Sequence, residues 1–226
     1  MRVVGVHGTG PVALAEVTQG TDPMEALLSQ GWAGRRPLLA KRAADGEIEL
    51  IVEAEPSHGA RPTHRDPGRD HGLTIGSEDP VMVKRRVAAY AVVESPRGVL
   101  ATEYSDLTSA AGRWGLPGGG VDGLEEPAAA VAREVHEETS QIVEVHDLVD
   151  VHSAHWVGRS PRGQLEDYHA IRLVYRASCP NPTDPVVIDV GGTTSAARWV
   201  SLDQARSITW TAGWMSLLER VLPHLD

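Results

Sequence analysis

The sequence predicts an α/β protein with a small β-rich extension at its N-terminus. Three observations support this fold class. Apolar and polar residues alternate in several short runs, which is typical of strands. Residues Ala128–Thr139 have the composition of a helix, with no interior Gly or Pro. Apolar residues near the C-terminus recur every three or four positions, as on a buried helix face. The 226 residues suffice for one large domain, or for one domain and an extension.

The extension is expected to cover residues 1–56 and to consist mainly of strands. Arg2–His7 and Val12–Val17 are β-branched runs on either side of Gly-Thr-Gly-Pro, which favours a strand pair. Pro37–Ala43 and Glu47–Glu55 flank Ala-Asp-Gly, which is typical of a hairpin.

One helix is expected between these strand pairs. Thr21 or Asp22 would cap it, Pro23 would stand at its first position, and it would run to Gln30. Two roles for the extension remain open. It is an appendage used for packing or for forming a dimer, or it covers a substrate pocket.

Residues 57–80 are expected to form a linker or long loop, because they are rich in Gly, Pro, Arg and His and lack periodicity. His58, His64 and His71 match no spacing of a closed metal site. A solvated linker is the preferred interpretation.

A main domain is expected over residues 81–226. Val81–Glu94 and Val99–Tyr104 flank Pro-Arg-Gly and favour a hairpin. Further strands are expected in Ile142–Val157, in Tyr168–Ala177 and at Ala196–Val200, with a polar loop before the second of these.

The C-terminal region is expected to be helical. Ser201 and Gln204 form a capping-box pattern. A buried helix face is predicted from apolar residues at intervals of three and four, namely Trp210, Trp214, Leu217, Leu218, Val221 and Leu222.

Composition limits the partners and the compartment. A formal charge of −10 argues against a nucleic-acid backbone or an anionic membrane as partner. Cys179 is the only cysteine, which excludes an intrachain disulfide and favours a reducing compartment. No basic-then-apolar leader and no apolar run of about 18 residues is present. A cytoplasmic location is therefore expected.

The strongest functional signal is a glycine-rich turn followed by an acidic helix. Pro127 is suited to the first helical position. On a helical wheel Glu134, Glu137 and Glu138 share one narrow sector, beside an apolar one. Like charges at this spacing destabilise an isolated helix, and hard oxygen ligands on one face suit Mg²⁺ or Mn²⁺. A solvated acidic face remains the alternative.

The full spacing of this stretch resembles the Nudix box of Nudix hydrolases. Gly119 is followed after five residues by Glu125, and after seven more by Arg133–Glu138. One position departs from the family pattern, because Ser140 stands where the family has a helix-ending Gly. The resemblance implies a Nudix-type α/β/α sandwich with a mixed β-sheet.

The resemblance also implies a metal-dependent hydrolase. It would cleave a phosphoanhydride bond in a nucleoside diphosphate linked to another group. Glu134, Glu137 and Glu138 would bind Mg²⁺, with Mn²⁺ as the alternative ion, together with the carbonyl oxygen of Gly118. Homodimers are common in the family, and a catalytically weak ligand-binding or structural domain is the alternative function.

Four residues are the expected catalytic set: Glu134, Glu137, Arg133 and Glu166. Glu137 is favoured as general base by analogy, with Glu166 as the runner-up, because family members often use an acid from a late loop. A solvated loop acid is the alternative for Glu166. Arg133 would pair with Glu125, eight residues or about two turns away, and orient Glu134.

Three residues are expected to contact the substrate. Arg86 would meet a phosphate, or is an ordinary edge-strand charge. Trp114 lies beside the glycine run and would line the pocket, or simply packs. Gly119 would let the backbone approach the ligand closely.

Overall fold

The computed structural model describes most of the chain, namely residues 1–63, 66–70, 72–76, 79–108, 110–160, 163–211 and 213–222. His64 and His71 lie outside the described residues. The chain forms two compact units. The first consists of Met1–Ala88 and Asp150–Leu173, and the second of Ala89–Val149 and Val174–Asp226. The expected division at residues 56 and 80 stays a prediction, since these units combine segments from different parts of the chain.

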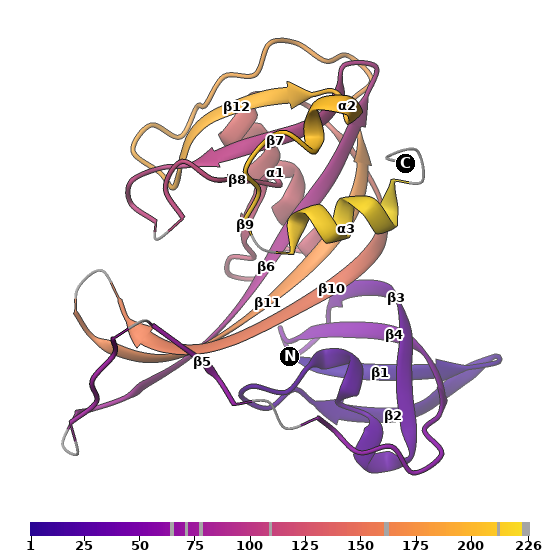
Figure 1. Ribbon diagram of the computed structural model, residues 1–226. Helices are drawn as coiled ribbons and strands as arrows, with labels where there is room; N and C mark the ends of the chain where they lie inside the picture. The colour runs from indigo at the N-terminus through magenta and orange to yellow at the C-terminus, as the bar shows by residue number, and fades with distance from the viewer. Residues whose placement is uncertain are drawn as a thin grey trace. The chain divides into compact units, whose positions relative to one another are not determined.

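A four-stranded sheet in the first unit contains the predicted strand pair and hairpin (Figure 1). Its strands are β1 (Arg2–His7), β2 (Gly10–Glu16), β3 (Trp32–Arg42) and β4 (Ile48–Pro56), in the order β2-β1-β4-β3. β1 pairs antiparallel with β2 and parallel with β4, and β3 pairs antiparallel with β4. One face of this sheet is buried. It carries the fully buried Val3 of β1 and every second residue of β4 from Ile48 to Ala54.

The single helix predicted before Gln30 is wrong. Two short 3₁₀ turns stand there, η1 (Pro23–Glu25) and η2 (Leu28–Gln30). The predicted cap is confirmed, because the Asp22 side chain accepts a hydrogen bond from the Met24 N–H at 2.9 Å. Short helices are marginal without tertiary support. Here the fully buried Leu27 fits against Gly5, so packing fixes the segment between the two turns.

The second sheet has eight strands in the order β12-β7-β6-β11-β10-β5, with β8 paired to β7 and β9 to β6. The polar loop predicted before the strand at Tyr168–Ala177 is shorter than expected, because one strand continues to Arg159 and the next begins at Leu165. The strands are β5 (Gly68–Arg69), β6 (Met82–Ser95), β7 (Gly98–Tyr104), β8 (Trp114–Gly115), β9 (Gly118–Gly120), β10 (Glu144–Arg159), β11 (Leu165–Ser178) and β12 (Thr194–Val200).

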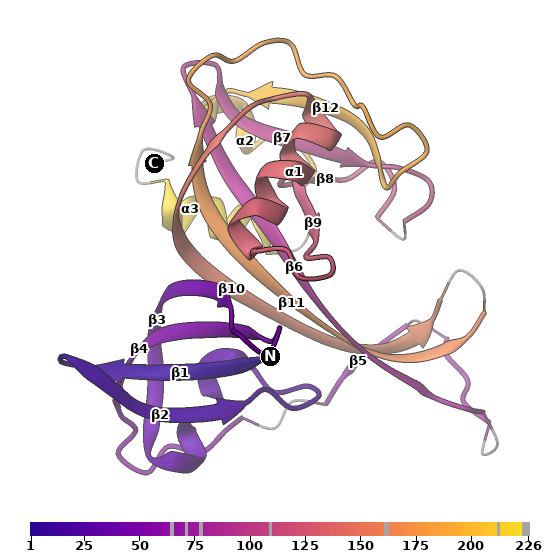
Figure 2. The same ribbon diagram turned by 180° about the vertical axis from the view of Figure 1, so that it is seen from behind.

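The second unit is an α/β/α sandwich, as predicted. Its helices are α1 (Pro127–Thr139), α2 (Leu202–Ala205) and α3 (Trp214–Val221). Figure 1 shows α3 in front of the sheet, and Figure 2, seen from behind, shows α1 on the opposite face. The sheet therefore separates α1 from α3.

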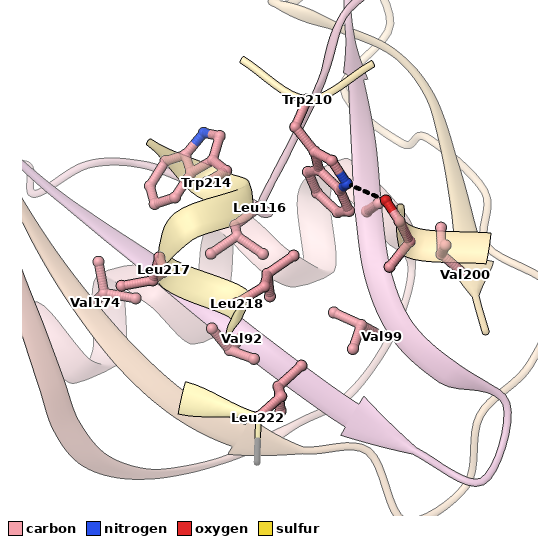
Figure 3. Packing of buried hydrophobic residues seen from close by; sticks show 12 residues of the cluster. Val92, Val99, Leu116, Val174, Val200, Trp210, Trp214, Leu217, Leu218 and Leu222 are labelled. Carbon is pink, nitrogen blue, oxygen red and sulfur yellow. Dashed lines mark hydrogen bonds between the residues drawn. The ribbon is translucent and has the colours of Figure 1, made fainter. Parts of the chain in front are cut away.

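The core beneath α3 is built as the C-terminal pattern predicts, with one correction. Leu217 and Leu218 point into it beside Val92 and Val174 (Figure 3). Trp210 is buried but precedes α3, since the helix begins after Gly213. The Trp210 indole N–H instead donates to the Ala205 carbonyl at 2.7 Å.

No helix within the described residues is long and apolar enough to cross a membrane.

Candidate active site

Helix α1 begins and ends as the sequence predicts. Pro127 occupies its first turn, and Ala130, Val131 and Val135 are fully buried. Ser140 ends the helix in the left-handed conformation, with φ of 60°, and its N–H donates to the His136 carbonyl at 2.8 Å. A non-glycine residue there costs roughly 1 kcal/mol. The Ser140 hydroxyl also accepts a hydrogen bond from the Val186 N–H.

Two glycines bring the turn before the helix close to its neighbours. A Cβ on Gly118, whose φ is +145°, would lie 2.3 Å from the Ala89 carbonyl oxygen. A Cβ on Gly119 would lie 2.5 Å from Glu134 Oε1. Only glycine fits at these positions without a shift of the strand or of the carboxylate. The glycine run therefore lets the Glu134 carboxylate lie against the backbone.

Arg133 is the centre of the acidic face. Its Nε and Nη2 donate to the two oxygens of Glu125, both at 3.1 Å, which confirms the predicted pairing. Its Nη1 donates to Glu134 at 3.0 Å and to Glu137 at 2.9 Å. Hydrogen bonds to Glu125 and Glu134 raise the pKa of Arg133 above its ordinary value. One nitrogen thus holds two of the three box carboxylates together.

Glu138 lies in a different environment, although it is on the same helix. Its side chain is 9% exposed, and its carboxylate accepts hydrogen bonds from the Gly118 N–H and the Thr194 hydroxyl. Burial raises the pKa of Glu138 to about 7, against the lowering effect of these two bonds. The negative charges of Glu134 and Asp189 raise it further. Glu138 is therefore poised to change its protonation state near neutral pH.

A loop before β12 closes the end of α1. The N–H groups of Ile188 and Asp189 both donate to the Glu137 carbonyl, at 2.9 and 3.1 Å, and Val186 donates to the Thr139 carbonyl. These bonds satisfy carbonyls that a helix end otherwise leaves without partners. They also fix the backbone of Asp189 beside the backbone of Glu137. The sequence analysis missed Asp189 and Thr194, and only their positions near the predicted closing strand would have drawn attention to them.

A cavity of about 620 Å³ opens beside this loop. Thr194, which bonds to Glu138, lines it, and so do the carboxylate-bearing residues Glu103, Asp106 and Asp189. Its volume falls in the range typical of ligand pockets, about 300–1,000 Å³. The buried acid and the cavity are therefore linked through the hydroxyl of Thr194.

The other predicted site residues lie elsewhere. Arg86 is exposed on the part of β6 in the first unit. Glu166 is also in the first unit, where it forms an ion pair with Lys84. Trp114 packs against the core of the second unit, and the Arg198 guanidinium lies 4.2 Å from the centre of its ring. The roles assigned to these three residues stay predictions.

The residues present fit a divalent cation by their chemistry. Glu134 and Glu137 offer carboxylate oxygens that already converge on one positively charged nitrogen, and such oxygens are the ligands that Mg²⁺ prefers. Both oxygens of Glu138 are engaged by donors in this arrangement. No group of three or more metal-binding side chains is found among the described residues. The predicted three-glutamate metal site stays a prediction.

The chain was compared with curated proteins, with solved structures and with family sequence models. No curated protein matches the chain. Solved structures do match: a MutT NUDIX hydrolase from Burkholderia pseudomallei is 25% identical over 61% of this chain and 98% of its own, with a TM-score of 0.41. The MutT protein from Methanosarcina mazei Go1 is 23% identical over 64% and 95%, with a TM-score of 0.44.

The NUDIX domain of Shewanella oneidensis NrtR, solved with ADP ribose, is 18% identical over 69% of this chain and 95% of its own, with a TM-score of 0.44. The sequence model of the NUDIX domain matches residues 84–220, more than half of the chain. The chain belongs to the NUDIX domain family.

Proposed function

We propose that this protein hydrolyses a phosphoanhydride bond in a nucleoside diphosphate linked to another group, with Mg²⁺ or Mn²⁺ as cofactor. The observation that supports this most is the convergence of Glu134 and Glu137 on Arg133 Nη1, beside Gly118 and Gly119. A solvated acidic face would spread such charges apart, because like charges on neighbouring turns repel. Here a built network gathers them.

Each residue of the network has a proposed task. Glu134, Glu137 and Glu138 would hold the cation with the Gly118 carbonyl oxygen. The bound ion would neutralise the phosphate charge and lower the pKa of a bound water. Arg133 fixes the positions of Glu134 and Glu137 through its bonds to Glu125 and is a positioning residue.

Glu137 is the proposed general base. Its side chain is 43% exposed, against 17% for Glu134, so water reaches it most easily. It would take the proton of the attacking water. Asp189 joins Glu166 as a candidate for this task, because its backbone is bonded to Glu137 and it lines the cavity. We propose that one end of the substrate binds in this cavity.

A hydrolysis screen tests the proposal. Phosphate-containing products are measured with sugar nucleotides, dinucleoside polyphosphates, dinucleotide cofactors and damaged nucleotides, each with Mg²⁺, with Mn²⁺ and with a chelator. On the best substrate, Glu138→Gln is expected to lower kcat by about 100-fold or more, because loss of one preorganised charge contact has effects of that size.

Glu144→Gln is the matched control. Glu144 is an exposed glutamate at the start of β10 in the same unit and should keep wild-type turnover. Wild-type turnover in Glu138→Gln would show that the metal assignment is wrong. No metal-dependent hydrolysis of any compound in the screen would remove the enzymatic proposal itself.

One observation favours the alternative, a catalytically weak domain that binds a ligand. Arg133 already neutralises part of the charge on Glu134 and Glu137, and Glu138 has both oxygens bonded. Calorimetric titration of the compounds from the screen separates the two functions. Binding without metal-dependent turnover would support the alternative.

A further inference from the structure

We infer that the four-stranded sheet of the first unit carries a face built to pack against the same face of a second copy of this chain. Side chains on alternate residues of a strand point to the same face. In this sheet Val3, Leu50 and Val52 are fully buried on one side. The opposite side, called the outer face, carries residues that are partly or fully exposed.

The strand register arranges an apolar row across the outer face. Leu14 on β2 pairs with Val4 on β1, Val4 pairs with Ile51 on β4, and Ile51 pairs with Leu39 on β3. The two ends of this row are the most exposed, with Leu14 at 56% and Leu39 at 46%. Four apolar side chains therefore stand side by side from one edge of the sheet to the other. A row of this kind is unusual on a face that remains in water.

A charged row lies two residues away on the same face. It runs across the strands as Glu16, Arg2, Glu49 and Lys41, in the order β2, β1, β4, β3. Arg2 and Lys41 both form ion pairs with Glu49. The signs thus alternate strictly across the sheet.

This order of signs is complementary to itself. A two-fold axis parallel to the strands would place β2 over β3 of the second copy and β1 over β4. Glu16 would then face a lysine, Arg2 would face a glutamate, and the apolar rows would meet. Sheets that pack face to face keep their strands roughly aligned, about 10 Å apart, and a symmetric dimer requires such a self-complementary surface.

The other face-to-face arrangement is disfavoured by charge. A two-fold axis perpendicular to the strands would place each strand over the same strand of the second copy. The charged row of one copy would then face a different row of the other copy, the one that lies on the opposite side of the apolar row. That row contains Glu53 and Arg36. Glu49 would then face Glu53, and Lys41 would face Arg36, so like charges would meet.

Pairing through the sheet edge is also hindered at β2. The Gln30 side chain bonds to both the N–H and the carbonyl of Leu14. This occupies backbone groups that another strand would need. The face is therefore the surface that β2 and its neighbours offer to a partner.

The area of the outer face sets the expected affinity of the dimer. With strands about 4.8 Å apart and about 3.3 Å per residue, four strands of six or seven residues cover roughly 400 Å². This is about half of the 800 Å² per partner in a standard interface. The dimer is expected to form over the micromolar range and to dissociate on dilution.

Sedimentation velocity of the full chain over about 1–300 μM tests the inference. Leu14→Glu and Leu39→Glu are each expected to raise the dimer dissociation constant by about 30-fold or more. Ile142→Glu is the matched control, because Ile142 is 80% exposed and lies in the second unit. It should leave dimerisation unchanged. A chain that stays monomeric over the whole concentration range overturns the inference, and the face would then serve another partner. A dimer that persists in both variants also overturns the inference.

A charge exchange tests the orientation. Glu16→Lys alone is expected to raise the dissociation constant by about tenfold, since two lysines would meet. Adding Lys41→Glu should restore dimerisation to within about threefold of the wild type. Circular dichroism of each variant confirms that the sheet is formed. A double variant no better than the single one overturns the parallel axis.

Crosslinking gives a second measurement that does not depend on weakening the dimer. A mixture of Leu14→Cys and Leu39→Cys chains is expected to crosslink with a short thiol-to-thiol reagent, whereas Leu14→Cys alone is not. The native Cys179 is 1% exposed, so the wild type serves as the unreactive control. Crosslinking of Leu14→Cys to itself would overturn the proposed arrangement.

Discussion

Two buried titratable side chains with strongly shifted pKa values, one in each compact unit, differ in what surrounds them. In the second unit Glu138, with a pKa raised to about 7, is linked through Thr194 to a large cavity. In the first unit His169 is fully buried, and burial followed by repulsion from His155 and Arg85 lowers its pKa to about 4.

Both ring nitrogens of His169 have hydrogen-bond partners, one in the backbone and one in a strand side chain. Its Nδ1 accepts a hydrogen bond from the Gly20 N–H at 3.2 Å, and its Nε2 lies 2.9 Å from the Ser153 hydroxyl. Beside it, Asp167 bonds to both Gln19 and His155. These bonds tie residues 19 and 20 to β10 and β11. Gly20, which donates to His169, lines a cavity of about 180 Å³, whereas Thr194, which donates to Glu138, lines one of about 620 Å³. The comparison teaches that burial and a shifted pKa do not alone mark a reactive group, and that the size of the adjoining cavity distinguishes the two.

The largest effects are expected at the box carboxylates. Glu134→Gln and Glu137→Gln should each lower kcat on the best substrate by about 100- to 1,000-fold, because each removes a charge that the Arg133 network positions. His155→Gln, in the histidine cluster of the first unit, should leave kcat unchanged. Steady-state kinetics decide this, and an equal loss in His155→Gln would break the distinction between the two clusters.

The buried His169 side chain should make the stability of the protein sensitive to acid. Its pKa is lower in the folded protein than in the unfolded chain, so the unfolded chain binds more protons between pH 6.5 and 4. The stabilising contribution is complete above pH 6.5 and is lost as the pH falls to about 4, by about 3 kcal/mol. Urea unfolding of the wild type and His169→Gln at pH 7.5 and 4.5 measures it. Equal losses in both proteins would contradict the prediction.

The buried glutamate should act in the opposite direction. Its pKa is raised on folding, so its favourable contribution is complete below its ordinary value of 4.5 and is lost as the pH rises through about 7. The unfolding free energy of the wild type relative to Glu138→Gln should fall by about 3 kcal/mol over that range. The measurement needs a chelator, because a bound cation would favour the charged carboxylate. A difference that rises with pH would show that the carboxyl is ionised on folding.

The smallest effects concern the two late acids. Asp189→Asn should lower kcat by about tenfold, whereas Glu166→Gln should change it by less than about threefold. The Lys84–Glu166 pair, whose lysine is 44% exposed, should contribute less than about 1 kcal/mol to stability. A larger loss of kcat in Glu166→Gln would return that residue to the position of general base.

Local spacing was sufficient to predict the acidic helix and its arginine. Arg133 reaches Glu125 because eight residues make about two turns, and the helix ends at Thr139 because the next residue adopts a left-handed conformation. The pairing depends only on neighbours in the chain, whereas the helix end is also held by hydrogen bonds from Val186 and Ile188. The longer strands of both sheets were likewise predictable from alternation, whereas the short strands β5, β8 and β9 were not predicted.

Contacts between distant segments were not predictable in this way. Thr194 meets Glu138 across 56 residues, and nothing in either local pattern indicates the pairing. The short turns before Gln30 replace a helix because Leu27 packs beneath Gly5, a contact made by the folded sheet. Trp210 fits the period of α3, but Gly213 starts the helix after it.

The amide groups of residues 186, 188 and 189 have a consequence for motion. Since they bond to the last carbonyls of α1, the loop and the final helical turn should open as one cooperative step. Their amide protons should therefore exchange with solvent at a common rate. A ligand that binds in the adjoining cavity and contacts this loop should slow amide exchange in the last turn of α1 as well. Ligand binding could therefore be detected from a segment that the ligand does not contact.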